Sequence, residues 1–218
     1  MYLLTHGNDL RMSLISLDPS RISMSDMYKL MIGGIVPRPI GFVSTVNRAG
    51  QGNLAPFSYF NAVSSDPPCV SVSITRKTDG SKKDTLINIE ETGQLVVNIV
   101  SESMVEPMNQ CSAEYPYGVD EMAKVGLTPV PSLKVKPARV GESLIQFECE
   151  TYQIVEVGEA KLGASSLVIA RVVQVHVNER VYSKGRILID ELKPLARLGG
   201  LSYGKVSGVF DLPRPGVS

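Results

Sequence analysis

Extended segments separated by turn residues dominate this chain and limit the folds open to it. The two longest are Leu144–Val157 and Leu167–Val177. No long helices alternate with the extended segments, which argues against parallel βαβ units and for antiparallel pairing. The sequence therefore predicts a mainly β fold, a closed or partly closed antiparallel barrel with a few short helices. Shorter strands are predicted at Ile40–Val46, Leu54–Val63, Cys69–Thr75 and Leu95–Val100.

Short helices are predicted where an apolar period typical of a helix ends at glycine. They are Asp26–Ile32 before Gly33-Gly34, Asp84–Glu91 before Gly93, and Asp120–Lys124 before Gly126. Ser103 and Glu106 have the spacing of a capping box, but a helix capped at Ser103 would contain Pro107. That boundary stays open. The Gly- and Pro-rich residues 194–218 are expected to wrap over a surface.

Charge and cysteine content exclude several functional classes. Lys+Arg and Asp+Glu both number 22, so no net charge attracts nucleic acid. No apolar run approaches the roughly 20 residues of a membrane-spanning helix, and the N-terminus lacks a signal-peptide core. Cys69, Cys111 and Cys149 are odd in number and widely spaced, which indicates neither a disulfide framework nor a zinc site. We expect reduced, buried thiols in a soluble cytoplasmic protein.

The segment Asn53–Asn61 mixes small, polar and aromatic residues unusually densely. A flat ring with a hydrogen-bonding edge needs this combination of apolar faces, backbone donors and amides. A barrel strand with a bulge at Pro56 explains the same residues. From composition alone both interpretations stay open.

The segment Arg76–Thr85 holds four cations, three hydroxyls and a glycine just before a predicted helix. Backbone N–H groups at a helix start, hydroxyl donors and Lys or Arg charge together suit a phosphate group. A solvated basic turn is the competing interpretation. The cluster is the only basic one in a neutral chain, which slightly favours a ligand.

Common catalytic motifs are missing from the sequence. It contains no HExxH, GxSxG or P-loop pattern, and no Cys/His pair with an orienting group. His176 is expected to be a polar-face strand residue rather than a catalyst. A protein whose cofactor supplies the chemistry needs none of these groups.

Several motifs, in order between about residues 23 and 206, together resemble the flavin reductase-like family. That family has an FMN-binding split barrel, an antiparallel, Greek-key-like fold. The motifs are Pro37–Thr45, Asn53–Phe60, Pro67-Pro68, Lys83-Asp84-Thr85 with Asn88-Ile89, and Arg197-Leu198-Gly199-Gly200 with Tyr203.

The resemblance implies FMN bound in a groove at a homodimer interface, with NAD(P)H as electron donor. It assigns the isoalloxazine contacts to Ser44, Thr45 and Val46. It assigns the lining of the ring and ribityl chain to Asn53, Leu54, Ala55, Pro56, Phe57 and Ser58. It assigns phosphate binding to Arg76, Lys83 and Thr85, and it places Arg197 and Tyr203 at the border of the pocket near the partner subunit. No catalytic side chain and no metal is expected.

The function implied is that of an NAD(P)H:flavin oxidoreductase, with a monooxygenase as a candidate recipient of reduced flavin. The alternative is a non-enzymatic electron carrier whose FMN is docked by a protein redox partner. The expected divisions are an N-terminal extension at 1–22, the flavin-binding barrel at 23–206 and a C-terminal tail at 207–218.

Overall fold

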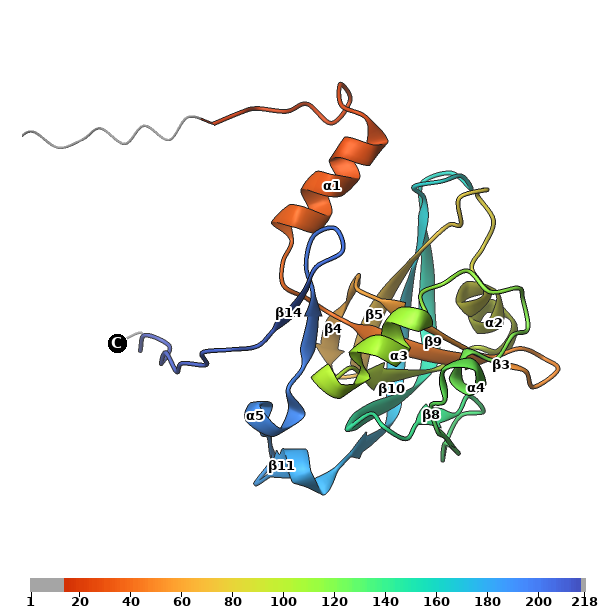
Figure 1. Ribbon diagram of the computed structural model, residues 1–218, viewed down its shortest axis with the longest axis vertical. Helices are drawn as coiled ribbons and strands as arrows, with labels where there is room; N and C mark the ends of the chain where they lie inside the picture. The colour runs from red at the N-terminus through yellow and green to blue at the C-terminus, as the bar shows by residue number, and fades with distance from the viewer. Residues whose placement is uncertain (1–13, 217–218) are drawn as a thin grey trace, which may run out of the picture.

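Antiparallel strands form the centre of the computed structural model, which describes residues 14–216 (Figure 1). Seven of them make one sheet in the order β3-β2-β6-β9-β10-β5-β4. The mainly β, antiparallel prediction is confirmed. The strands are β2 (Gly41–Val46), β3 (Gly52–Phe57), β4 (Phe60–Ser65), β5 (Pro68–Thr75), β6 (Gln94–Ile99), β9 (Ile145–Val157) and β10 (Ser165–Val177).

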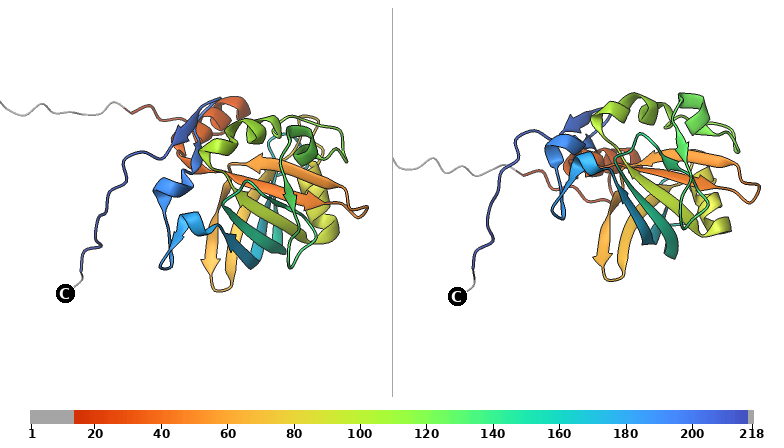
Figure 2. Two further views of the ribbon diagram at one scale, coloured as in Figure 1. Left: turned by 60° about the horizontal axis from the view of Figure 1, so that its bottom comes forward. Right: turned by 90° about the horizontal axis from the view of Figure 1, so that it is seen from below.

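The two outermost strands of this sheet, β3 and β4, follow each other directly in the chain. A single strand over Leu54–Val63 was therefore a wrong prediction, since the chain bends at Ser58 and Tyr59. The bend carries the chain from one end of the sheet order to the other, so the sheet curls back on itself. The β4–β5 hairpin projects from the rest of the barrel (Figure 2).

A second sheet, β1-β13-β14, joins the C-terminal region to the start of the barrel. It consists of β1 (Arg38–Pro39), β13 (Leu195–Arg197) and β14 (Tyr203–Lys205). Only this part of the C-terminal region packs on the protein. Residues 206–216 form no helix or strand and are exposed, so the wrapping predicted for them is wrong. Two short pairs complete the strands: β7 (Pro129–Val130) with β8 (Arg139–Val140), and β11 (Tyr182–Ser183) with β12 (Arg186–Ile187).

The helices are short and lie around the barrel. They are α1 (Met24–Gly34), α2 (Asp84–Thr92), α3 (Val105–Gln110), α4 (Glu121–Val125) and α5 (Ile189–Leu192), with 3-10 turns at Glu102–Met104 and Glu179–Val181. Among the residues described, no helix is long and apolar enough to cross a membrane.

The first helix differs from the sequence prediction at both ends, and the structure defines the boundary that the sequence left open at Ser103. The first helix begins at Met24, because the Ser23 hydroxyl caps it by accepting the Asp26 N–H at 3.0 Å. It runs through both glycines and ends at Gly34, with Ile35 as its C-cap and Pro37 two residues further on. Ser103 caps nothing: α3 begins at Val105 and takes Pro107 into its first turn, where its missing N–H removes no helical hydrogen bond.

Strand β2 has both faces buried, and this places two layers around it. Val43 packs into the barrel core with Leu86 and Ile89 of α2. Phe42 packs on the opposite side, with Met108 of α3 and Met122 of α4. The two layers bring the start of α2 and the loop between α3 and α4 to the same stretch of β3.

Candidate functional site

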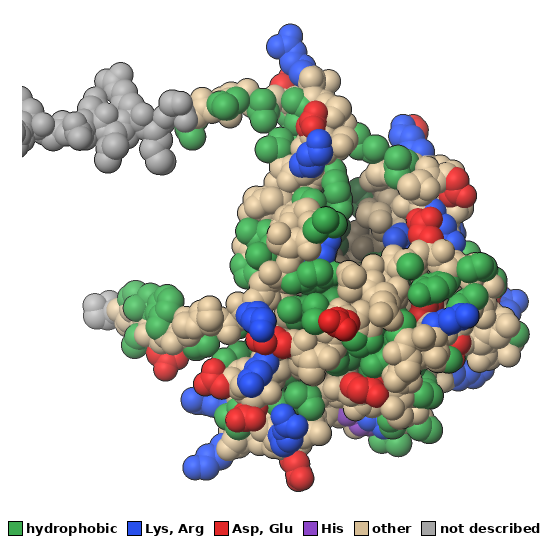
Figure 3. Space-filling view, in the orientation of Figure 1, with side chains coloured by type: hydrophobic (Ala, Val, Ile, Leu, Met, Phe, Trp, Pro, Cys, Tyr) green, Lys and Arg blue, Asp and Glu red, His purple; other side chains and the backbone are tan. Residues whose placement is uncertain are grey.

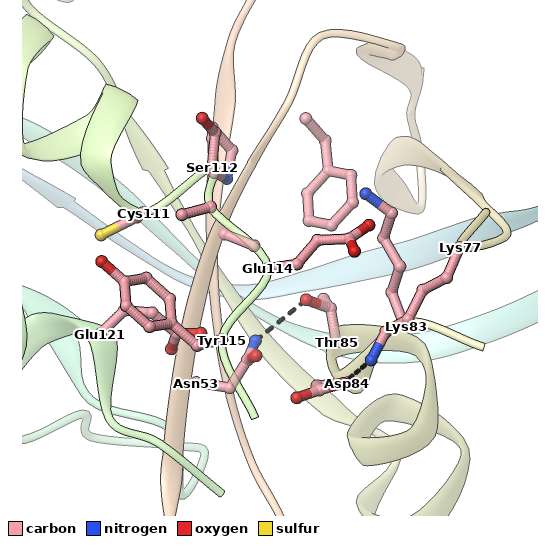
Figure 4. Close-up of a pocket in the computed structure, with 14 residues that line it drawn as sticks. Asn53, Lys77, Lys83, Asp84, Thr85, Cys111, Ser112, Glu114, Tyr115 and Glu121 are labelled. Carbon is pink, nitrogen blue, oxygen red and sulfur yellow. Dashed lines mark hydrogen bonds and ion pairs between the residues drawn. The ribbon is translucent and has the colours of Figure 1, made fainter. Parts of the chain in front are cut away.

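A cavity of about 120 Å³, here the first cavity, lies between β3, the start of α2 and the loop after α3. Figure 4 shows Lys77, Lys83, Asp84 and Thr85 on one side and Cys111, Ser112 and Tyr115 on the other. The remaining lining residues are Asn53, Ala55, Pro56, Phe57, Ala113, Glu114 and Glu121. The Tyr117 hydroxyl donates to Asn88 Oδ1 at 3.2 Å, which ties the loop to α2.

A buried polar network fixes β3 to α2 at the base of this cavity. Asn53 Nδ2 donates to Thr85 Oγ1 at 2.9 Å and to Thr45 Oγ1 at 3.2 Å. Asn88 Nδ2 donates to the same Thr45 oxygen at 3.1 Å. Because buried amides are costly to leave unpaired, these bonds set the position of the α2 start relative to β3.

The start of α2 has the character of an anion site. Its N-cap residue is Lys83, and no side-chain oxygen caps the helix. The first N–H groups of a helix have no intrahelical acceptor and attract negative charge. Lys77 Nζ pairs with Asp84 at 2.8 Å, whereas Lys83 has no carboxylate partner in the part of the chain described. Lys83 is therefore the cation available to a bound anion.

Two buried groups of this cavity have raised pKa values. Burial raises the pKa of Glu121, whose Oε2 accepts the Leu54 N–H at 2.8 Å. Burial, with the charges of Glu121 and Asp120, raises the pKa of the Cys111 thiol to about 12. The thiol therefore stays protonated at neutral pH and is not a nucleophile.

A second cavity, of about 530 Å³, adjoins the first and shares Pro56 and Ser112 with it. Its other lining residues are Tyr28, Ile40, Ser58, Met108, Asn109, Arg197, Leu201 and Tyr203. The Arg197 guanidinium lies over the Tyr203 ring, 4.4 Å from its centroid. Figure 3 shows a hollow in the face of the molecule where α1 and β14 meet the barrel. The two adjoining cavities are together called the groove.

The structure brings most of the residues singled out in the sequence to this groove. The first cavity contains Asn53, Ala55, Pro56, Phe57, Lys83 and Thr85. Ser58, Arg197 and Tyr203 line the second cavity.

Five of those residues line neither cavity. Ser44, Thr45 and Leu54 are buried, and the Ser44 hydroxyl donates to Ala138 O at 2.5 Å. Val46 faces a separate hollow beside Asn47–Gly50. Arg76 is buried and pairs with Glu156 at 2.7 Å.

Sequence reasoning did not select the loop residues Cys111–Tyr115 or Glu121. They reach the groove only because α3 and α4 pack on β2, and no periodic or motif signal marks them. Lys77 and Asp84 lay inside the basic segment already singled out, but neither was selected as a ligand contact.

His176 lies outside both cavities. Its Nε2 is 2.6 Å from Oε1 of Glu148, a carboxylate that is fully buried on β9. Glu148 also accepts the backbone N–H groups of Leu133 and Lys134. The arrangement fastens a loop to the sheet, which fits a structural His176. No cluster of metal-binding side chains occurs among residues 14–216.

Known proteins are similar to this chain in sequence and in fold. The model of the flavin reductase like domain matches residues 33–195. The crystal structure of nitrilotriacetate monooxygenase component B from Bacillus cereus is 40% identical, with a TM-score of 0.88 over 92% of this chain and 99% of that one. The 2-nitrobenzoate 2-nitroreductase from Pseudomonas fluorescens is 30% identical, with a TM-score of 0.82 over 92% and 96%.

A Shewanella frigidimarina structure with a split barrel domain shares the fold at 22% identity, with a TM-score of 0.77 over 90% of this chain and 96% of that one. The match to the domain model covers most of the chain and contains β3, α2 and the loop that form the first cavity. The chain folds as a split β-barrel and belongs to the flavin reductase-like family.

Proposed function

We propose that the chain binds FMN, with the phosphate at the start of α2. The single observation that carries this proposal is the uncapped helix start at Lys83, beside the Thr85 hydroxyl and facing β3. Backbone N–H groups, a hydroxyl and an unpaired lysine are the donors that a phosphate dianion needs. Asn53, Ala55 and Phe57 supply the polar and apolar contacts next to it.

The size of the cavities supports a ligand that extends along β3. At about 120 Å³ the first cavity is smaller than the roughly 300–1,000 Å³ of usual ligand pockets, and the second, at about 530 Å³, lies within that range. A phosphate in the first cavity therefore leaves the ribityl chain and ring to extend along β3 as far as Pro56, where the second cavity begins.

The proposed reaction is transfer of a hydride from NAD(P)H to the flavin. The flavin supplies the redox chemistry, so the residues of this chain bind, orient and exclude water. The protonated Cys111 thiol agrees with a protein that supplies no redox group of its own, and no side-chain nucleophile is required.

A homodimer and a monooxygenase partner complete the proposal. Helix α1 buries only Ile32, while Met24, Tyr28, Leu30 and Met31 are exposed. Such an apolar surface suits an interface between subunits. The similarity to a monooxygenase component B supports a partner that consumes reduced flavin. The limits proposed for the flavin-binding unit are residues 23–206.

Titration with FMN tests the proposal. We expect about one FMN per subunit, seen as quenching of flavin fluorescence, and steady NADH or NADPH oxidation when free FMN is added. A protein that binds FMN but oxidises neither nucleotide would be the electron carrier of the alternative hypothesis. Absence of FMN binding would overturn the proposal.

A second candidate function is reduction of a small aromatic acceptor at the bound flavin. The observation that favours it is the 30% identity to a 2-nitrobenzoate 2-nitroreductase over nearly all of both chains. Oxidation of NAD(P)H that depends on a nitroaromatic acid rather than on free FMN would select this function.

A further inference from the structure

The charges that line the second cavity differ from those of the first. The first cavity is lined by three acidic residues and two lysines, which are Asp84, Glu114, Glu121, Lys77 and Lys83, whereas Arg197 is the one charged residue of the second. In the second cavity a negatively charged ligand therefore meets a positive charge and no lining carboxylate.

A buried arginine, Arg38, adds positive charge behind the lining of the second cavity. Arg38 is only 5% exposed and has no carboxylate within ion-pair distance among residues 14–216. Its guanidinium donates to three backbone carbonyls, those of Ile32, Ile35 and Leu198, and its Nε donates to Ser58 Oγ at 3.3 Å. Because the surrounding protein screens charge poorly, an anion close to Ser58 would be stabilised.

Three polar side chains of the second cavity, those of Ser58, Asn109 and Arg197, have hydrogen-bond donors without an acceptor in the described structure. Ser58 accepts from Arg38, and no acceptor for its hydroxyl proton occurs in the described structure. Asn109 Oδ1 accepts from the Tyr203 hydroxyl at 2.9 Å, which leaves the Asn109 NH₂ group free to donate. Arg197 uses Nη2 to bond Gly200 O at 2.6 Å and keeps other N–H groups. Ligand oxygens that accept hydrogen bonds and donate none, such as those of a carboxylate, would satisfy all three side chains.

Apart from Ser112, the rest of the lining is apolar or aromatic. Tyr28 and Tyr203 contribute rings, while Ile40, Met108 and Leu201 contribute aliphatic surface. Walls of this kind bind a planar ring, and a small inorganic anion would leave them without contacts.

We propose that the second cavity binds an aromatic carboxylate, with the carboxylate held by Ser58, Asn109 and Arg197. Its position next to a flavin rests on the proposed function, whereas recognition of the anion does not. The cavity would thus take the second substrate or an effector of that chemical class.

Isothermal titration of the full chain loaded with FMN tests this proposal, with sodium benzoate as the probe. Benzamide keeps the ring without the charge, and acetate keeps the charge without the ring. We expect benzoate to bind about tenfold or more tightly than either. Flavin fluorescence, recorded in parallel, reports whether FMN stays bound.

Matched variants locate the site. Arg197→Gln should remove the preference for benzoate over benzamide, and Arg197→Lys should restore part of it. Arg186→Gln, an exposed arginine on β12, should leave the preference unchanged. Circular dichroism checks folding. If Arg197→Gln does not fold, Ser58→Ala replaces it, with an expected loss of several fold in benzoate affinity.

Three results would overturn the inference: no preference for benzoate over benzamide, an unchanged preference in Arg197→Gln, or release of FMN by benzoate. A chain that holds FMN without preferring benzoate contradicts this inference alone. A chain that binds no FMN but still prefers benzoate contradicts only the proposed function.

Discussion

At the scale of single residues, the three cysteines are buried and His176 lies outside both cavities. Cys111 has a protonated thiol, Cys69 and Cys149 lie in the barrel core or beside it, and His176 holds a buried carboxylate. Burial of this kind suits packing, while catalytic thiols and imidazoles lie in accessible, polarised surroundings.

We therefore expect no cysteine or histidine of the described structure to be indispensable for flavin reduction. Cys69→Ser, Cys111→Ser, Cys149→Ala and His176→Ala should each lower the single-turnover rate of FMN reduction by less than about tenfold, or roughly 1.4 kcal/mol of barrier. Stopped-flow absorbance of FMN-loaded protein measures this rate. A thousandfold loss in a folded variant that holds FMN would reveal an acid–base or thiol step.

Glu148 should contribute to stability in a pH-dependent way. Burial acts to raise its pKa, but the hydrogen bonds from Leu133 N–H, His176 and Lys134 N–H together outweigh burial, so the pKa lies below the usual range. A carboxyl with a lowered folded-state pKa stabilises the fold above its unfolded pKa, about 4.3 for glutamate, and loses that contribution as pH falls through the folded-state value.

Glu148→Gln should therefore lower the free energy of unfolding at pH 7 by about 1–3 kcal/mol. The difference from the natural chain should shrink as the pH falls below about 4. Urea unfolding at several pH values measures both quantities. A difference that stays constant down to pH 3 would contradict the role assigned to the ionised carboxylate.

At the scale of elements, turn chemistry determined which boundaries the sequence could predict. Gly93 and Gly126 have φ of +70° and +71°, where glycine is favoured, and both end helices as predicted. Gly33 and Gly34 carry no such φ and remain inside α1. A glycine ends a helix only where the chain must turn with a positive φ. The sequence alone does not show where such a turn is required.

This difference predicts opposite effects of two similar substitutions. Gly93→Ala should destabilise the protein by about 1 kcal/mol, because a Cβ is strained at positive φ although no atom lies within 4 Å of it. Gly34→Ala, also with open space around its Cβ, should be neutral or stabilising by up to about 1 kcal/mol. Thermal unfolding of both variants tests the pair. Equal destabilisation would show that space, not backbone conformation, governs these positions.

At the scale of the whole molecule, the sequence predicted an antiparallel barrel because its extended segments are separated by turns and not by long helices. The way in which the barrel closes could not be predicted. The bend at Ser58 and Tyr59 looks like continuous strand in sequence, because its aromatic and small residues suit β structure. The part of the groove made by Asn53, Ala55–Phe57 and Lys83–Thr85 was predictable because local motifs contain these residues. Glu121 and Cys111–Tyr115 were not, since tertiary packing alone brings them to β3.

The exposed apolar face of α1 predicts a homodimer. Light scattering at micromolar concentration should give about twice the mass of one 23.6 kDa chain. Leu30→Glu, which places a charge on that face, should shift the mass toward the monomer. A monomeric natural chain with FMN bound would refute the dimer.

The central claim is that the start of α2 holds the phosphate of a flavin, and riboflavin, which has no phosphate, tests it directly. Affinities for FMN and riboflavin are measured by fluorescence titration in Lys83→Ala and in Lys82→Ala, a control whose lysine pairs with Glu90 and lines neither cavity. We predict that Lys83→Ala weakens FMN by roughly ten- to a hundredfold and leaves riboflavin unchanged, while Lys82→Ala changes neither. Equal weakening of both ligands by Lys83→Ala would contradict a phosphate site at α2.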